Sequence, residues 1–342
     1  MIPIAASASL PPLPWVVFDS PERSFALSKS EQEALLGQLR AAGVDFLSTL
    51  PTSLPRPYGD CPPNAPAVSL FQQVNSPGSG IDDAKRKALR SFLELGRSAG
   101  VLFWVKVFEF EHDEGGLWRD SYWGEDQSRL HYVDAIIEAL EFDNEGRRDP
   151  IPAVLSWEEC PRSSSYVRDF LAYAKRPWLR TAIHNRNGTP DDYQIQRELL
   201  DDPNLDIIEL QVSNPADTHN VARWFRERTD KLIIPTEAGP GNIGIAPDYA
   251  RDERMVRWWV DEPRQYTNGL GIYVGYQWPQ NDLYLVDVSP WAGFLNEVTT
   301  KLASSGKVLE YLLGLRSSAG LDQNHDGAVD AADILYLRTL GR

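Results

Sequence analysis

The sequence has few cysteines and no long apolar run. Only Cys61 and Cys160 occur among its 342 residues, so a small fold stapled by several disulfides is excluded. The sequence allows either one disulfide between these two residues or two free thiols. No apolar stretch approaches the roughly 18–20 residues that a membrane-spanning helix needs, which predicts a chain without membrane insertion. Met1 to Leu10 has no basic segment, so no export signal is recognised there.

Basic residues are also scarce. Lys and Arg total 34 against 49 Asp and Glu, which gives a formal net charge of −15 at pH 7. Such a charge repels phosphate backbones and anionic lipid surfaces, so we expect no nucleic-acid partner and no membrane partner. A neutral ligand fits this charge better. The 11 Trp and 13 Tyr are many for a chain of this size, which suggests that some of them have a functional role.

Short apolar runs alternate with amphipathic stretches over residues 14–304. The strand-like runs are Trp15–Asp19, Val44–Leu50, Val101–Phe110, Ala153–Trp157, Leu179–His184, Asp206–Ser213, Lys231–Thr236 and Gly269–Trp278. Helical patterns lie between them, for example at Ser30–Ala42, Ile81–Ala99, Leu130–Phe142, Ser163–Ala174 and Val221–Thr229. Eight apolar strands alternating with helices are typical of a parallel barrel whose strands are buried on both faces. The predicted fold class is therefore α/β, a (β/α)8 TIM barrel over residues 14–304, with an N-terminal extension at 1–13 and a separate segment at 305–342.

A doubly wound open sheet is the alternative fold. That fold would place a Gly-rich phosphate loop after its first strand, and none is present. The glycines of Gly239–Gly244 follow the seventh run and lack the dinucleotide-binding spacing. A glycine cluster of this kind is typical of a loop.

Residues 322–333 have the pattern of an EF-hand calcium loop. Oxygen-bearing side chains stand at loop positions 1, 3, 5, 9 and 12, Gly327 stands at position 6, and position 7 supplies a backbone carbonyl. An acidic surface turn is the alternative, and it is less favoured because so many positions of the calcium loop match at once. The sequence therefore predicts a structural Ca²⁺ ion held by Asp322, Asn324, Asp326, Ala328, Asp330 and Asp333.

The twelfth position of this loop is Asp rather than the usual Glu. The pattern D-x-N-x-D-G-x-V-D-x-x-D resembles the duplicated calcium segment of dockerin modules. The first loop of the pair is missing, because residues 296–307 carry no Asp or Asn ladder. The resemblance implies docking onto a cohesin domain of a scaffold or cell-surface protein in polysaccharide-degrading bacteria, and hence a secreted chain. A clamp that fastens the tail to the barrel is the alternative.

Glutamates follow the fourth and seventh strand-like runs, where barrel enzymes carry their catalytic groups. Trp157 is followed by Glu158 and Glu159, and Thr236 is followed by Glu237. These segments resemble the W-N-E-P and T-E-x-G motifs of retaining glycoside hydrolases of the large barrel clan that includes cellulases, mannanases and galactosidases. The resemblance implies that Glu237 is the nucleophile and Glu159 the acid/base. Glu158 takes the place of the usual Asn and is a second candidate for the acid.

Other residues are candidates for substrate binding. The loop after the third run is rich in aromatic rings, which stack well on the apolar faces of sugars. A tryptophan at the end of the eighth run matches one that this clan places beneath the sugar. Polar groups at the ends of the fifth, sixth and eighth runs could contact hydroxyls. The full set is Trp118, Tyr122, Trp123, Trp278, His184, Gln211 and either Tyr273 or Tyr276.

Three functions follow from these patterns. The first is a secreted bacterial glycoside hydrolase that cleaves a β-linked polysaccharide by double displacement with two Glu and no catalytic cofactor. The second is a catalytically inactive, carbohydrate-binding barrel attached to a cohesin-bearing scaffold. A lyase or metal-dependent enzyme is less favoured, because no His/Asp cluster in the barrel has metal-ligand spacing.

Overall fold

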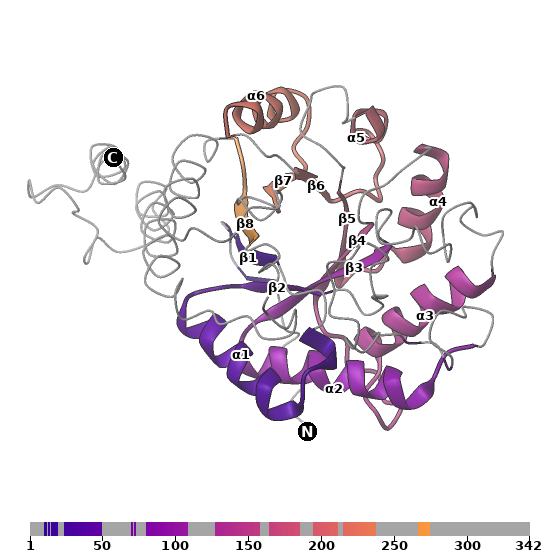
Figure 1. The fold of residues 1–342 in the computed structure, drawn as a ribbon. Coiled ribbons are helices and arrows are strands. Elements are labelled where there is room, and N and C mark those ends of the chain that lie inside the picture. Colours follow the sequence, from indigo (N-terminus) through magenta and orange to yellow (C-terminus); the bar gives the residue numbers. More distant parts are fainter. Residues whose placement is uncertain are drawn as a thin grey trace, which may run out of the picture.

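The computed structural model shows eight parallel strands curled into a barrel. It describes residues 10–11, 13, 15–19, 24–49, 70, 72, 80–108, 127–157, 164–184, 194–210, 215–236 and 266–273. The strands are β1 (Trp15–Asp19), β2 (Phe46–Thr49), β3 (Leu102–Phe108), β4 (Ala153–Trp157), β5 (Leu179–Ile183), β6 (Ile207–Leu210), β7 (Leu232–Pro235) and β8 (Gly269–Tyr273). Their order in the sheet is β7-β6-β5-β4-β3-β2-β1-β8. In Figure 1 they form a central ring, and the labelled helices lie outside it.

The ring closes where β7 meets β8. Asn268, directly before β8, donates its backbone N–H to the Ile233 carbonyl at 2.8 Å, and its side-chain oxygen accepts the Ile233 N–H at 3.0 Å. The Asn268 carbonyl also accepts the Trp15 N–H at 3.0 Å. Gly271 permits close contact, because a Cβ there would lie 2.4 Å from the Cα of Thr236. Closure brings the carboxyl ends of all eight strands to one rim.

Helices cover the outside of the ring. Two of them have well-defined ends: Ser28 and Glu31 form a capping box at the start of α1, and Asp82 caps α2, which ends at the left-handed Gly100 (φ 78°). The helices are η1 (Ser24–Ala26), α1 (Lys29–Ala41), α2 (Asp83–Ala99), α3 (Gln127–Glu141), α4 (Ser164–Ala174), α5 (Gln194–Glu198) and α6 (Pro215–Arg226).

Most predicted elements are confirmed to within a few residues, with two differences. The sequence placed a helix at Val221–Thr229, whereas α6 begins at Pro215. Proline suits the first turn of a helix, where its missing N–H is not needed, but the polar residues that follow it carry no apolar period. The short helix α5 was not predicted, because a single turn shows no periodicity.

The apolar core forms two layers. The larger layer lies between the strands and the outer helices, and the smaller fills the inside of the barrel. Inside, the rings of Trp15, Phe46 and Trp104 pack with centroids 4.9 to 6.5 Å apart. Leu10 packs against this inner cluster, and the Pro11 carbonyl accepts the Trp15 indole N–H at 2.9 Å. Residues ahead of β1 therefore help to seal the amino end of the barrel.

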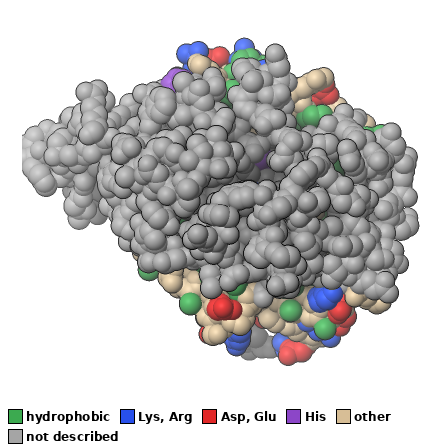
Figure 2. All heavy atoms as spheres, viewed as in Figure 1, with side chains coloured by type: hydrophobic (Ala, Val, Ile, Leu, Met, Phe, Trp, Pro, Cys, Tyr) green, Lys and Arg blue, Asp and Glu red, His purple; other side chains and the backbone are tan. Residues whose placement is uncertain are grey.

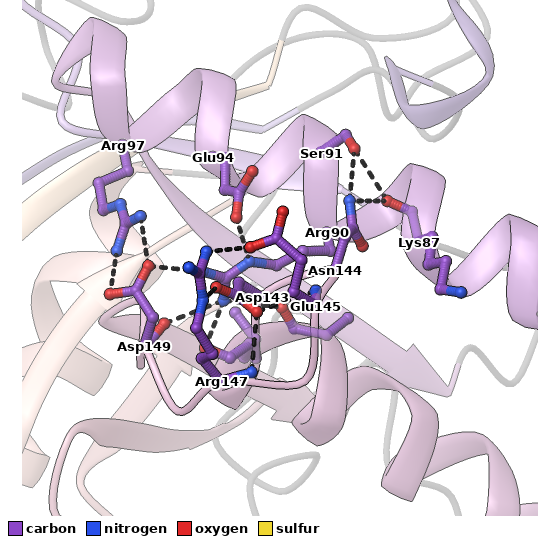
Figure 3. A network of polar contacts seen from close by, with 12 residues as sticks. Lys87, Arg90, Ser91, Glu94, Arg97, Asp143, Asn144, Glu145, Arg147 and Asp149 are labelled. Carbon is purple, nitrogen blue, oxygen red and sulfur yellow. Dashed lines mark hydrogen bonds and ion pairs between the residues drawn. The ribbon is translucent and has the colours of Figure 1, made fainter.

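A polar network ties α2 to the end of α3 (Figure 3). The fully buried Arg90 donates to the carbonyls of Ala139 and Leu140, each at 3.3 Å, in the last turn of α3. It also donates to the Asp149 carboxylate at 2.9 Å, and Arg97 donates to both oxygens of that carboxylate. The bonds from Arg97 hold the pKa of Asp149 below its usual value. Arg90 thus satisfies carbonyls that a helix end leaves without partners.

The outer helices carry charges of both signs. Figure 2 shows blue and red side chains mixed at the lower margin, where Figure 1 places α1 and α2. In α2, Arg86 and Lys87 pair with Asp83, at 2.6 and 2.8 Å. Ion pairs with an exposed partner such as Asp83 add little to stability, so the apolar layer holds these helices. In the part of the chain that the structure describes, no helix is both long enough and apolar enough to cross a membrane.

We expect Arg90→Met to lower the free energy of unfolding by roughly 2–3 kcal/mol, because it leaves buried carbonyls at the end of α3 without a donor. Chemical unfolding followed by circular dichroism measures this loss. The matched control is Arg147→Met, which breaks an exposed pair with Asp143 and should change the midpoint little. Equal losses in the two variants would contradict the structural role assigned to Arg90.

Asp45 makes the stability of the barrel depend on pH. Its carboxylate accepts the Val16 N–H at 2.8 Å, beside the start of β2. Burial raises the pKa of Asp45 to about 6. The folded chain therefore holds this proton more tightly than the unfolded chain does. As the pH rises from about 4 to about 6, the unfolded chain loses the proton first, and stability falls over that window.

The variant Asp45→Asn keeps an oxygen for the Val16 N–H but cannot ionise. Near neutral pH we expect its free energy of unfolding to exceed that of the wild type by roughly 1–3 kcal/mol. The difference should vanish near pH 4. Urea unfolding at the two pH values measures the effect. A difference that does not change with pH would show that ionisation of Asp45 is not its cause.

Candidate active site at the carboxyl rim

The inside of the barrel changes from apolar to polar toward the carboxyl rim. Side chains alternate along a strand, so a residue two positions after an inward-facing one also faces inward. Apolar inward-facing residues are followed in this way by buried polar ones on five strands. The pairs are Phe46 and Ser48, Val154 and Ser156, Ala182 and His184, Ile207 and Glu209, and Ile234 and Thr236. The polar layer makes this rim the candidate site.

Glu209 on β6 connects three strands across the interior. One of its carboxylate oxygens accepts the indole N–H of Trp104 on β3, at 3.1 Å. The same oxygen accepts the hydroxyl of Ser156 on β4. Both donors and the carboxylate are fully buried. These bonds therefore connect β3, β4 and β6 from inside the barrel, at Trp104, Ser156 and Glu209.

Backbone bonds extend the ladders one residue beyond β5 and β7. His184 donates its N–H to the Trp157 carbonyl at 2.9 Å, and Thr236 donates its N–H to the Leu210 carbonyl at 3.2 Å. Thr236 also lies against Gly271 of β8. Its buried hydroxyl has no hydrogen-bond partner among the described residues. Thr236 therefore presents a polar group at the rim, directly before Glu237 in the sequence.

Trp157 faces the other way. It is the last residue of β4 and packs edge-on against Phe170 of α4, with ring centroids 5.3 Å apart. The outward ring of Trp157 and the inward hydroxyl of Ser156 fix the orientation of β4 up to its end. Glu158 and Glu159 follow directly in the sequence.

Of the predicted substrate-binding and catalytic residues, the structure describes the side chain of His184 alone. His184 is buried and directly follows β5, at the carboxyl rim, as predicted for a residue that ends the fifth run. Its predicted contact with the nucleophile or a hydroxyl stays a prediction. The other candidates lie outside the described residues: Glu158, Glu159, Glu237, Gln211, Trp118, Tyr122, Trp123, Tyr276, Trp278 and the calcium loop at 322–333.

Sequence reasoning missed Glu209 and Ser156. The signal was a single carboxylate inside the apolar run of β6, in phase with the inward-facing Ile207. A buried carboxyl group needs partners, so such a position can be recognised as special. Within the described ranges, no group of three or more His, Cys, Asp or Glu could hold a metal ion.

Searches against protein-family models and curated proteins find no match. Solved structures do match. An endo-beta-1,4-mannanase from Thermotoga petrophila has a TM-score of 0.59 at 13% identity, with 86% of this chain and 78% of that chain covered. A glycoside hydrolase family 5 mannosidase from Rhizomucor miehei has a TM-score of 0.58 at 10% identity, with 96% and 95% covered. This likeness shows the fold: the chain is a parallel α/β barrel similar to those of these enzymes.

Proposed function

We propose that this chain is a retaining glycoside hydrolase that cleaves a β-linked polysaccharide. The observation that carries the proposal is the position of three glutamates relative to the barrel. Glu158 and Glu159 come directly after β4, and Glu237 is the second residue after the end of β7. Both strands end at the polar rim. The similar structures from Thermotoga petrophila and Rhizomucor miehei, a mannanase and a mannosidase, support the same chemistry and make β-mannan the first substrate to test.

In the proposed mechanism Glu237 is the nucleophile and Glu159 the acid/base. Glu159 protonates the leaving oxygen while Glu237 attacks the anomeric carbon and forms a glycosyl-enzyme. Water, deprotonated by Glu159, then releases the sugar with its configuration retained. This reaction needs the two carboxyl groups about 5–5.5 Å apart, with one protonated and one ionised. The curled parallel sheet brings the carboxyl ends of β4 and β7, the strands that precede these glutamates, to one rim.

Glu158 is the alternative acid. It stands two positions after the inward-facing Ser156, and it replaces the Asn that the resembling hydrolases carry. That replacement also favours the second candidate function, a barrel that binds carbohydrate without cleaving it. In either case Trp118, Tyr122, Trp123 and Trp278 are proposed to stack on sugar rings.

We expect Glu237→Ala to abolish measurable release of reducing sugar from β-mannan, and Glu159→Ala to lower kcat/KM by about 10²–10⁴-fold, the usual contribution of a general acid/base. Glu158→Ala distinguishes the two candidate acids, and it should retain most of the activity if Glu159 is the acid/base. If Glu158→Ala loses the activity and Glu159→Ala keeps it, the acid is Glu158. Full activity in all three variants would eliminate the mechanism, and a wild type that binds mannan without cleaving it would favour the second function.

We also propose that residues 322–333 bind Ca²⁺ as a structural ion. Every loop position that must supply oxygen does so, and calcium prefers six to eight oxygen ligands. The ion would order the tail, either as a docking surface for a cohesin domain or as a clamp on the barrel. A site of this type suits the calcium concentration outside cells, in agreement with a secreted chain.

Titration calorimetry should show one Ca²⁺ bound with a dissociation constant between about 10⁻⁶ and 10⁻³ M. Asp326→Ala removes a ligand and should abolish the heat of binding. His325→Ala changes a loop position that supplies no ligand and serves as the matched control. Unchanged binding in Asp326→Ala would rule out the proposed ligand set.

A further inference from the structure

Glu209 is an unusual residue for the inside of this barrel. Its side chain is fully buried, and its neighbours on β6 are Ile207, Ile208 and Leu210. Most inward positions in the amino half of the barrel carry apolar side chains. Burying a carboxyl group costs free energy that an apolar side chain of similar size would not cost. Packing alone therefore does not explain why glutamate stands here.

The contacts of Glu209 are directional. The indole N–H of Trp104 can only donate, and it points at the carboxylate oxygen from 3.1 Å. The Ser156 hydroxyl donates to the same oxygen. Because a hydrogen bond weakens steeply when its angle bends, these two bonds restrict how β3 and β4 can shift relative to β6. Neither partner is close in sequence, so the restraint exists only in the folded barrel.

The restrained residues lead directly into the candidate catalytic segment. Ser156 is two residues before Glu158 and three before Glu159, and Trp104 lies on the strand that precedes the aromatic loop with Trp118. We infer that Glu209 is a positioning residue, which holds the carboxyl end of β4 through Ser156 and so sets the acid/base against the nucleophile. This inference rests on the proposed hydrolase function. It assigns to Glu209 no contact with the substrate.

A positioning role has a distinct kinetic signature. A displacement of about 1 Å in a catalytic group can lower the rate about a hundredfold while the substrate still binds. Loss of the Glu209 bonds should therefore lower kcat and leave KM nearly unchanged. A residue that supports only the fold would change the thermal midpoint without this pattern.

Two substitutions separate the hydrogen bonds from the charge. Glu209→Gln keeps an oxygen that can accept from Ser156 and Trp104, and we expect kcat within about threefold of the wild type. Glu209→Met has a similar length and accepts neither bond, and we expect kcat to fall about 10–100-fold with KM within about threefold. Both are measured on β-mannan, with circular dichroism to confirm folding.

Thr181→Val is the matched control for lost stability. It removes a buried hydroxyl that bonds the Asn204 carbonyl at the amino end of the barrel, and it should leave kcat unchanged. If Glu209→Met does not fold, Ser156→Ala decides, because it removes one of the two bonds and keeps the carboxyl group. A fall of about 3–10-fold in its kcat is then expected.

The outcomes separate this inference from the proposed function. If the wild type is active and Glu209→Met keeps its kcat, the positioning role alone is overturned. If Glu209→Met does not fold, an unchanged kcat in Ser156→Ala overturns it instead. A fall in kcat in Glu209→Gln as large as that in Glu209→Met also overturns it, because the charge and not the bonds would then matter. A wild type that cleaves no β-linked polysaccharide overturns the hydrolase proposal, and the role of Glu209 with it.

Discussion

The contact between β7 and β8 is the constraint on which the rest of the structure depends. Asn268 supplies hydrogen bonds to Ile233 from both its backbone and its side chain, and Gly271 lets β8 lie against the backbone of Thr236. A larger side chain at 271 would separate the two strands. With the ring closed, strand ends that are far apart in sequence share one rim, and polar groups on β4 and β7 belong to one site.

The two ends of the barrel interior carry different kinds of side chain. At the amino end, Trp15, Phe46 and Trp104 pack together, and Leu10 contacts the same cluster. This half supplies the apolar burial that stabilises a barrel. Toward the carboxyl end the inward positions become Ser, His, Glu and Thr. Buried polar groups cost stability unless they are bonded, so their concentration at one end indicates where function, rather than folding, determines the residues.

The fold could be predicted from the sequence because its strands are apolar on successive positions. Ala153–Trp157 was predicted with both ends correct, since Pro152 precedes this mostly apolar run and two glutamates follow it. The start of α6 was missed, because its first turn is polar. The Glu209 network was missed for another reason. Its partners Ser156 and Trp104 are 53 and 105 residues away in sequence, and no local spacing connects them. The catalytic role of the glutamates and the calcium-binding role of residues 322–333 were predicted from short motifs and stay predictions.

The central claim is that Glu237 forms a covalent bond with the sugar at the carboxyl rim. Incubation with 2-deoxy-2-fluoro mannosyl and glucosyl fluorides tests it directly, because fluorine at C2 slows both steps while the fluoride leaving group speeds only the first, so the glycosyl-enzyme accumulates. Mass spectrometry of the digested protein should show one added fluorosugar on the peptide that contains Glu237. A chain that cleaves β-mannan but carries the label on another carboxylate, or carries no label, would contradict the account.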